Sequence, residues 1–170
     1  MACLETMLSR RQLLAASPTT LPLFLALSAC KGPAVLSGPP PVSDQTNMLL
    51  HAVTVEQNLI WLYGKTAAAH SSLKTALAPI LAEHQAHLAQ LRGRVIEPPG
   101  KHVPDTVTVR PAVGATPAAA LTQLRAAEKA AIATLMSRLG GASPSLAQLY
   151  ASVAASEATH VTELTGQIGA

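Results

Sequence analysis

The chain has 170 residues, which is enough for one domain and short for two. Hydrophobic residues make up 49% of it, aromatic residues 2% and charged residues 12%, and alanine supplies much of the apolar content. Because alanine is the strongest helix former and a weak strand former, the composition predicts an all-α protein. The net charge of +3 comes from 12 basic and 9 acidic residues without a basic cluster, which argues against nucleic-acid binding.

Residues 1–30 have the features of an export signal and are left out of the fold argument. Arg10-Arg11 forms a twin-arginine pattern before a mostly apolar stretch at residues 13–29. That stretch is short and interrupted by Pro, Ser and Thr, so it makes a poor permanent membrane span. It ends in Leu27-Ser28-Ala29-Cys30, which resembles the lipobox of bacterial lipoproteins. The resemblance implies that Cys30 becomes the lipid-modified first residue of the mature chain.

We therefore expect export by the twin-arginine route and a lipid anchor in the cell membrane, on its extracytoplasmic face. An ordinary signal peptide with an unrelated cysteine is the alternative, and translation can start at Met1 or at Met7. Cys3 and Cys30 are the two cysteines of the chain, so no disulfide is expected in the mature domain. Residues 31–43 are rich in Pro and Gly and predict an extended tether.

One helical domain is expected over residues 44–170. The first helix is predicted to begin at about Asp44, with Ser43 or Asp44 as its N-cap, and to end at a turn near His70. A second helix is predicted to end near Arg94, with a kink or a restart at Pro79. The two predicted apolar seams are Leu49, Val53, Glu56, Ile60, Tyr63 and Ala67, and then Leu73, Leu77, Ile80, His84, His87 or Leu88, and Leu91.

A long loop and two further helices complete the predicted domain. The Pro- and Gly-rich residues 95–116 are long for a loop and can run the length of a bundle. Thr116-Pro117 starts the third helix, Gly140-Gly141 ends it, and Ser143-Pro144 starts the fourth. The seams are Leu121, Leu124, Glu128, Ala131 or Ile132, and Leu135, and then Leu146, Leu149 or Tyr150, Val153, Glu157, His160 and Leu164. Two hairpins joined by one long crossover form the ferritin-like topology among four-helix bundles.

Six ionisable residues fall on or beside these apolar seams near mid-helix: Glu56, His84, His87, Glu128, Glu157 and His160. Burying an unpaired carboxylate is expensive, so three in one small core predict a strong positive charge among them. At about 1.5 Å per residue, each hairpin brings its members to a similar height along the bundle. Glu157-Ala158-Thr159-His160 is Glu-x-x-His, whose two side chains share one helix face.

On these residues, together with Trp61-Leu62-Tyr63 and Glu83-His84-Gln85-Ala86-His87, residues 45–168 resemble the ferritin-like superfamily. They look most like the alanine-rich ferritin-like lipoproteins of actinobacteria. The resemblance implies a di-metal centre in which Glu56 and Glu128 are the single-helix carboxylates and Glu157 with His160 is one Glu-x-x-His pair. It also implies iron as the metal, with Mn or Zn as alternatives.

The second helix departs from that family pattern. A Glu-x-x-His starting at Glu83 would need a histidine where Ala86 stands, and His84-x-x-His87 has the required spacing instead. Glu83 is then a seventh candidate, as a further ligand or a bridge. More imidazole and less carboxylate make the donor set less selective among Fe, Mn, Zn and Cu.

Two functions follow from these expectations. The first is a lipid-anchored metal-binding protein, with metal binding ranked above enzymatic turnover because no residue specifies a substrate. The second is a metal-free bundle that keeps a Glu/His hydrogen-bond network and serves a structural or partner-binding role at the cell envelope. A homodimer is compatible with both.

Overall fold

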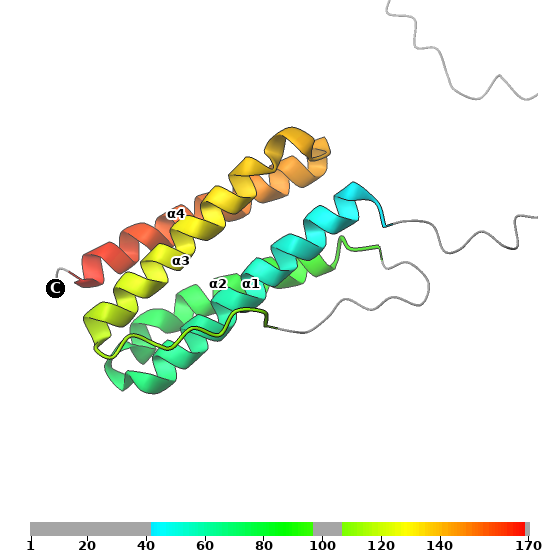
Figure 1. The fold of residues 1–170 in the computed structure, drawn as a ribbon. Helices are drawn as coiled ribbons and strands as arrows, with labels where there is room; N and C mark the ends of the chain where they lie inside the picture. Colours follow the sequence, from blue (N-terminus) through cyan, green and yellow to red (C-terminus); the bar gives the residue numbers. More distant parts are fainter. Residues whose placement is uncertain (1–41, 97–106, 169–170) are drawn as a thin grey trace, which may run out of the picture. The chain divides into compact units, whose positions relative to one another are not determined.

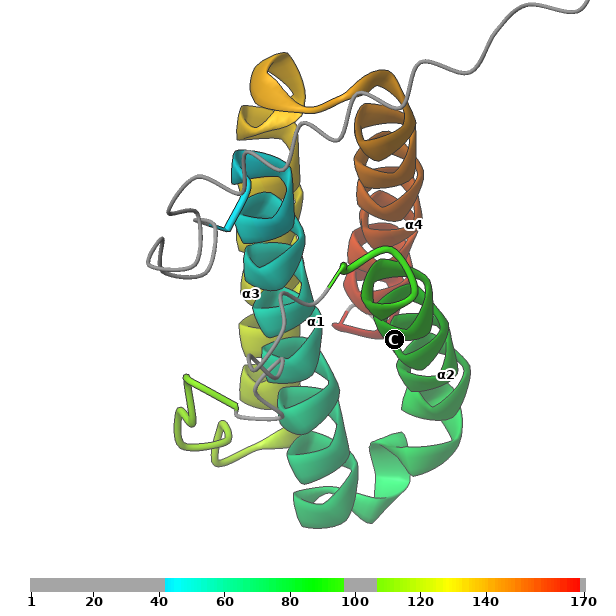
Figure 2. The same ribbon diagram turned by 90° about the vertical axis from the view of Figure 1, so that its right-hand side faces the viewer.

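The computed structural model describes residues 42–96 and 107–168, and this part of the chain is an all-α four-helix bundle (Figure 1). The helices are α1 (Asp44–Ala69), α2 (Lys74–Arg92), α3 (Pro117–Ser137) and α4 (Pro144–Ile168). Short 3-10 turns join each hairpin, η2 (Ser71–Leu73) between α1 and α2 and η3 (Leu139–Gly141) between α3 and α4. The helices of each hairpin pack against each other, and α1 also packs against α3 (Figure 2). The predicted fold class is thereby confirmed.

The helix ends follow the predicted capping residues. The Ser43 hydroxyl accepts a hydrogen bond from the Thr46 amide at 3.1 Å, and Thr116 caps α3 in the same way. Pro117 is the first residue of α3, where its missing N–H leaves no bond unmade. The helix α2 continues through Pro79, so the predicted restart is not found there, although Pro79 has no amide N–H to donate to the preceding turn.

The described end of the crossover, residues 107–116, is held against both hairpins by side-chain hydrogen bonds. The side-chain oxygen Oδ1 of Asn58, on α1, accepts hydrogen bonds from the backbone amides of Thr108 at 3.0 Å and Val109 at 3.1 Å. On α3, Gln123 bonds both the carbonyl of Ala112 and the amide of Gly114. The crossover therefore has fixed partners on α1 and on α3.

The apolar core is divided into two clusters. One contains Leu49, Ala52, Val53, Leu91, Leu135, Leu146, Leu149, Tyr150, Val153 and Ala154. The other contains Leu59, Leu62, Tyr63, Leu77, Ile80, Leu121, Leu124, Ala131 and Leu164. Ile60 is a predicted seam position that is only partly buried, and its neighbour Leu59 is buried in its place. Ala67 and Leu73 are also only partly buried, but they pack against the second cluster. The two clusters leave a band near the middle of the bundle for the polar residues described below.

Within residues 42–96 and 107–168, no helix combines the length and the hydrophobicity needed to cross a lipid bilayer. The predicted signal, the predicted lipidation site Cys30 and most of the predicted tether lie outside the described residues.

Candidate metal centre

All four helices contribute ionisable side chains to a buried layer between the two apolar clusters. These side chains are Glu56 from α1, His84 and His87 from α2, Glu128 from α3, and Glu157 and His160 from α4. Five of the six residues are at most 1% exposed, and the side chain of His87 is 11% exposed. The helical spacing places these residues on the inner faces, since each follows the apolar seam of its own helix.

His84 connects the carboxylates of two helices at the centre of this layer. Its Nδ1 lies 2.9 Å from Oε2 of Glu56, and its Nε2 lies 2.9 Å from Oε1 of Glu128. An ionised carboxylate only accepts hydrogen bonds, so both ring nitrogens donate and His84 is an imidazolium. Burial would lower the pKa of His84, but the hydrogen bonds to Glu128 and Glu56 raise it to about 9.

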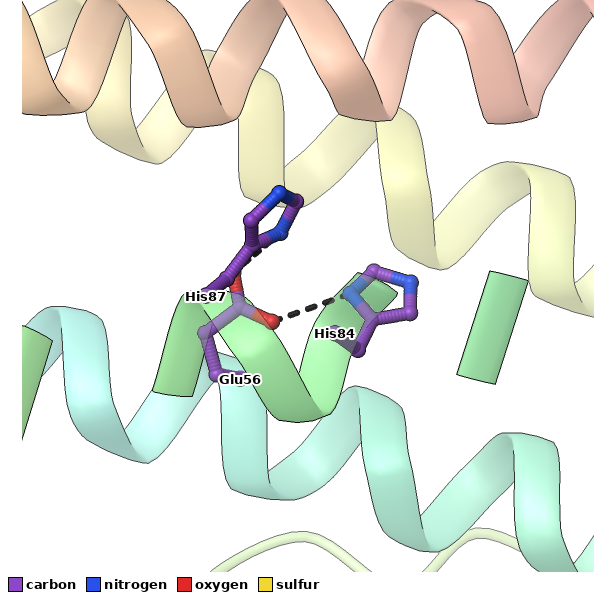
Figure 3. Close-up of side chains that lie close together, drawn as sticks. All are labelled: Glu56, His84 and His87. Atoms are coloured by element: carbon purple, nitrogen blue, oxygen red, sulfur yellow. Dashed lines mark hydrogen bonds and ion pairs between the residues drawn. The ribbon is translucent and has the colours of Figure 1, made fainter. Parts of the chain in front are cut away.

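His87 extends from the next turn of α2 toward the same Glu56 carboxylate (Figure 3). Its Nδ1 is 3.5 Å from Oε1 of Glu56, an ion-pair distance, so one oxygen of Glu56 is hydrogen-bonded and the other, Oε1, is buried without a hydrogen bond. Burial opposes ionisation of Glu56, yet His84 and His87 together lower its pKa.

Glu128 is the most heavily contacted of the three buried acids. Besides His84, it accepts a 2.5 Å hydrogen bond from the Tyr63 hydroxyl at Oε1, and Nδ1 of His160 lies 3.5 Å from the same oxygen. Burial would raise the pKa of Glu128, but His160, His84 and Tyr63 lower it to about 2. Glu128 is therefore a buried carboxylate that stays ionised.

Glu157 has the opposite electrostatic situation. It is 0% exposed, and neither of its oxygens makes a hydrogen bond within the described part of the chain. Burial and the neighbouring carboxylates of Glu56 and Glu128 raise the pKa of Glu157 to about 9. A buried acid without a hydrogen-bond partner is rare in proteins and calls for an explanation.

Glu83, the seventh candidate, lies at the edge of the layer. Its side chain is 57% exposed, and its Oε2 accepts from Nε2 of His160 and from the Ser156 hydroxyl, both at 3.0 Å. These bonds lower the pKa of Glu83. Glu83 therefore contacts the predicted ligand His160 from the edge of the layer, while the buried Glu128 faces the other nitrogen of the same ring.

The sequence did not single out the hydrogen bonds made by Tyr63 and Ser156. Tyr63 was predicted as a position of the first apolar seam, without a hydrogen-bond partner, although it lies two turns after Glu56 on the same face of α1. Ser156 was not considered, although it lies one turn before His160 on α4. Both spacings were available signals, but neither indicates which residue on another helix would be the partner.

Two groups of these residues have the geometry of a metal site. They are Glu56 with His84 and His87, and His84 with Glu128 and His160; in each group, one ligand atom per residue lies within 4.8 Å of the others. The three imidazoles are also close, with ring centroids 4.9 Å apart for His84 and His160. Glu157 and Glu83 belong to neither group, so the cluster has His84 rather than a carboxylate at its centre.

The donor atoms that are left without hydrogen bonds fit a bound cation. Buried oxygens of Glu56, Glu128 and Glu157 and the Nδ1 atoms of His87 and His160 have no hydrogen-bond partner. Carboxylate oxygen and imidazole nitrogen are the ligands that Fe, Mn and Zn accept in proteins. The residues present therefore suit a divalent metal ion.

Comparison of the chain with protein-family models, with curated protein sequences and with solved structures gives no significant match.

Proposed function

We propose that this protein binds a pair of divalent metal ions, of the iron type, in the core of an exported, lipid-anchored bundle of the ferritin-like kind. The observation that carries the proposal is Glu157, a fully buried acid with two unpartnered oxygens beside two other carboxylates. The hydrogen bonds of His84 explain how the buried charges of Glu56 and Glu128 are balanced, but they do not involve Glu157 and leave it without a role. A metal ion would give it one, because the ion would displace the proton of Glu157 and bind buried oxygen atoms that accept no hydrogen bond.

The proposed ligands are Glu56, Glu128 and Glu157, which bind or bridge the ions, and His84, His87 and His160 as terminal ligands. For His84 to bind metal, it must give up a hydrogen bond to Glu56 or to Glu128. A bound iron would supply Lewis-acid and redox chemistry at this place. We rank binding above turnover, because no described residue selects a substrate.

The test is the metal content of the mature protein purified from its native host, measured by elemental analysis. We expect about two ions per chain in the wild type, with most of this metal lost in Glu157→Gln. Glu163→Gln is the matched control, since Glu163 is an exposed acid on the same helix, and it should keep its metal. Wild-type protein without stoichiometric metal would refute the proposal.

A metal-free bundle is the second candidate function, and the double hydrogen bond of His84 favours it. As an imidazolium, His84 already neutralises Glu56 and Glu128, and His160 is bonded to Glu83. This candidate predicts the same melting temperature with and without a chelator. The metal proposal predicts a lower melting temperature after chelation, because an ion bound only to the folded state stabilises it.

The export and anchoring part of the proposal depends on Arg10-Arg11 and on the lipobox-like residues up to Cys30. The mature domain would then begin its first helix at Asp44, after a tether long enough to separate it from the membrane surface. Replacing Cys30 by Ala should move the protein from the membrane fraction to the soluble extracytoplasmic fraction. Unchanged membrane association would refute the lipid anchor.

A further inference from the structure

Glu83 lies outside the buried layer but is bonded to one of its members. Its Oε2 accepts from Nε2 of His160 at 3.0 Å, so a residue of α2 holds a histidine of α4. The other nitrogen of that ring, Nδ1, makes no hydrogen bond and lies 3.5 Å from Oε1 of Glu128 in the interior. The ring of His160 therefore has one nitrogen toward an exposed carboxylate and the other toward a buried one.

Glu83 is also the most exposed of the seven candidate residues. Glu83 is 57% exposed and the side chain of His87 is 11% exposed, whereas the other five candidate residues are almost inaccessible. The two apolar clusters close the layer toward both ends of the bundle. The helices α2 and α4 approach each other less closely than the pairs α1 with α2, α3 with α4, and α1 with α3.

We propose that Glu83 receives a divalent cation from solvent at the α2–α4 face and, through its bond to Nε2, positions His160 to bind that ion by Nδ1. The inference rests on the proposed function, because it assigns the entrance to the same metal centre. It also gives Glu83 a different role from that of a permanent ligand.

The positioning part follows from the chemistry of imidazole. A neutral histidine carries one N–H, and a carboxylate at one nitrogen holds the proton there. When His160 is neutral, Glu83 accepting from Nε2 leaves the lone pair on Nδ1, which lies 3.5 Å from Oε1 of Glu128. Carboxylates that orient metal-binding histidines in this way are common around metal sites.

The capture part follows from charge and exposure. An exposed carboxylate attracts cations and speeds their association, an effect that salt weakens. Glu83 presents such a carboxylate at the place where the layer is accessible, and its second oxygen, Oε1, carries no hydrogen bond to His160 or Ser156. An ion bound by Glu83 would be separated from the buried donor atoms by the ring of His160.

The first experiment follows the uptake of Co²⁺ by the full mature protein, using visible absorption in a stopped-flow instrument. Glu83→Gln should slow association about tenfold at low salt and leave the final number of bound ions unchanged. Glu163→Gln, which removes another exposed acid, on α4, should associate at the wild-type rate. The difference between wild type and Glu83→Gln should shrink as salt is added.

The second experiment assigns the nitrogens of His160 in the Zn²⁺-loaded protein by long-range ¹H–¹⁵N NMR. In the wild type, we expect Nδ1 to be metal-bound and Nε2 to carry the proton. In Glu83→Gln, this preference should weaken, with part of the population binding through Nε2. A merely structural role of Glu83 would leave the pattern of bound nitrogens unchanged.

The outcomes distinguish this inference from the proposed function. Wild type that binds Co²⁺ stoichiometrically, with an equally fast Glu83→Gln, overturns the entrance and leaves the metal centre standing. Loss of bound ions in Glu83→Gln makes Glu83 a ligand and also overturns the inference. Wild type that binds no Co²⁺ overturns both.

Discussion

The hydroxyl of Tyr63 donates a 2.5 Å hydrogen bond to Oε1 of Glu128, and both residues are 0% exposed. We predict that Tyr63→Phe destabilises the metal-free protein by about 1.5–3 kcal/mol, because it removes a hydrogen bond to a buried charge. Tyr150 is the matched control, since it is equally buried but its hydroxyl has no hydrogen-bond partner in the described structure. Tyr150→Phe should be neutral or stabilising. Urea denaturation measures both, and equal losses of stability would contradict the assignment.

Glu128 and Glu157 should respond differently to the same change. Glu128→Gln leaves the His84 imidazolium with one charged partner, and we expect a loss of about 3–5 kcal/mol in the free energy of unfolding. Glu157→Gln should lose less than about 1.5 kcal/mol at pH 7, because Glu157 with its pKa of about 9 is already neutral there. The comparison uses metal-free protein in chelator. A severe loss in Glu157→Gln would show that Glu157 is ionised and structurally paired.

The stability of the metal-free protein should fall as pH rises from 6.5 to 9. Folding raises the pKa of His84 from 6.5 to about 9 and that of Glu157 from 4.5 to about 9. In this window, the folded state holds about two protons that the unfolded state has released, so unfolding becomes easier with each increase in pH. Glu128 acts in the opposite direction and is protonated only as pH falls from 4.5 toward 2.

Thermal melts between pH 4 and pH 10 measure this pH dependence. In Glu157→Gln, the decline should begin near pH 6.5 instead of near pH 4.5, because the remaining contributions come from His84 and His160, whose pKa values folding raises above 6.5. A flat profile of stability between pH 6.5 and pH 9 in the wild type would contradict the prediction.

Metal binding should release protons at neutral pH. The ions must displace protons from His84 and Glu157, which both hold them below about pH 9. Metal affinity should therefore increase from pH 6.5 to pH 9. Calorimetric titration with Zn²⁺ in two buffers of different ionisation enthalpy measures the number of protons released. Binding heats that do not depend on the buffer would show that the ligands are already deprotonated.

Gly114 at the end of the crossover should not tolerate a side chain. A Cβ at this position would lie 2.6 Å from the amide nitrogen of Ala120 and 3.0 Å from the carbonyl oxygen of Ala119. Gly114→Ala should destabilise the protein by about 1–3 kcal/mol, because rigid backbone must move. Gly64, inside α1, is the control, since a Cβ added there would have no other atom within 4 Å. Gly64→Ala should stabilise the protein by about 0.5–1 kcal/mol, because alanine favours the helix over glycine. Urea midpoints of the two variants test the contrast.

The fold could be predicted from the sequence because its signals are local. Ser43, Thr116 and Pro117 mark helix starts by capping chemistry that depends only on their own helix. The spacing of apolar residues likewise places Glu56 and Glu128 on inner faces. Seam errors fell on neighbouring positions such as Ile60 and Leu59, which differ by one step around the helix, and the restart predicted at Pro79 was also wrong.

The pairing inside the site could only partly be predicted. Helical rise brings Glu56, His84 and Glu128 to one height, but it does not show that the ring of His84 lies between the two carboxylates. That depends on helix rotation and side-chain rotamers, which residue spacing does not determine. For the same reason, the bond from His160 to the exposed Glu83 could not be foreseen.

The position of the charged layer between two apolar clusters also determines how the hairpins can dock. Three of its members come from the α1/α2 hairpin and three from the α3/α4 hairpin. If one hairpin slid by a single helical turn, about 5.4 Å, Glu128 and Glu157 would meet leucines and leave His84 without one of its counterions. Misaligned packing of the two hairpins is thus less stable than the native packing even without bound metal. An all-hydrophobic replacement of the six residues should melt at a higher temperature and show several competing alignments of the two halves.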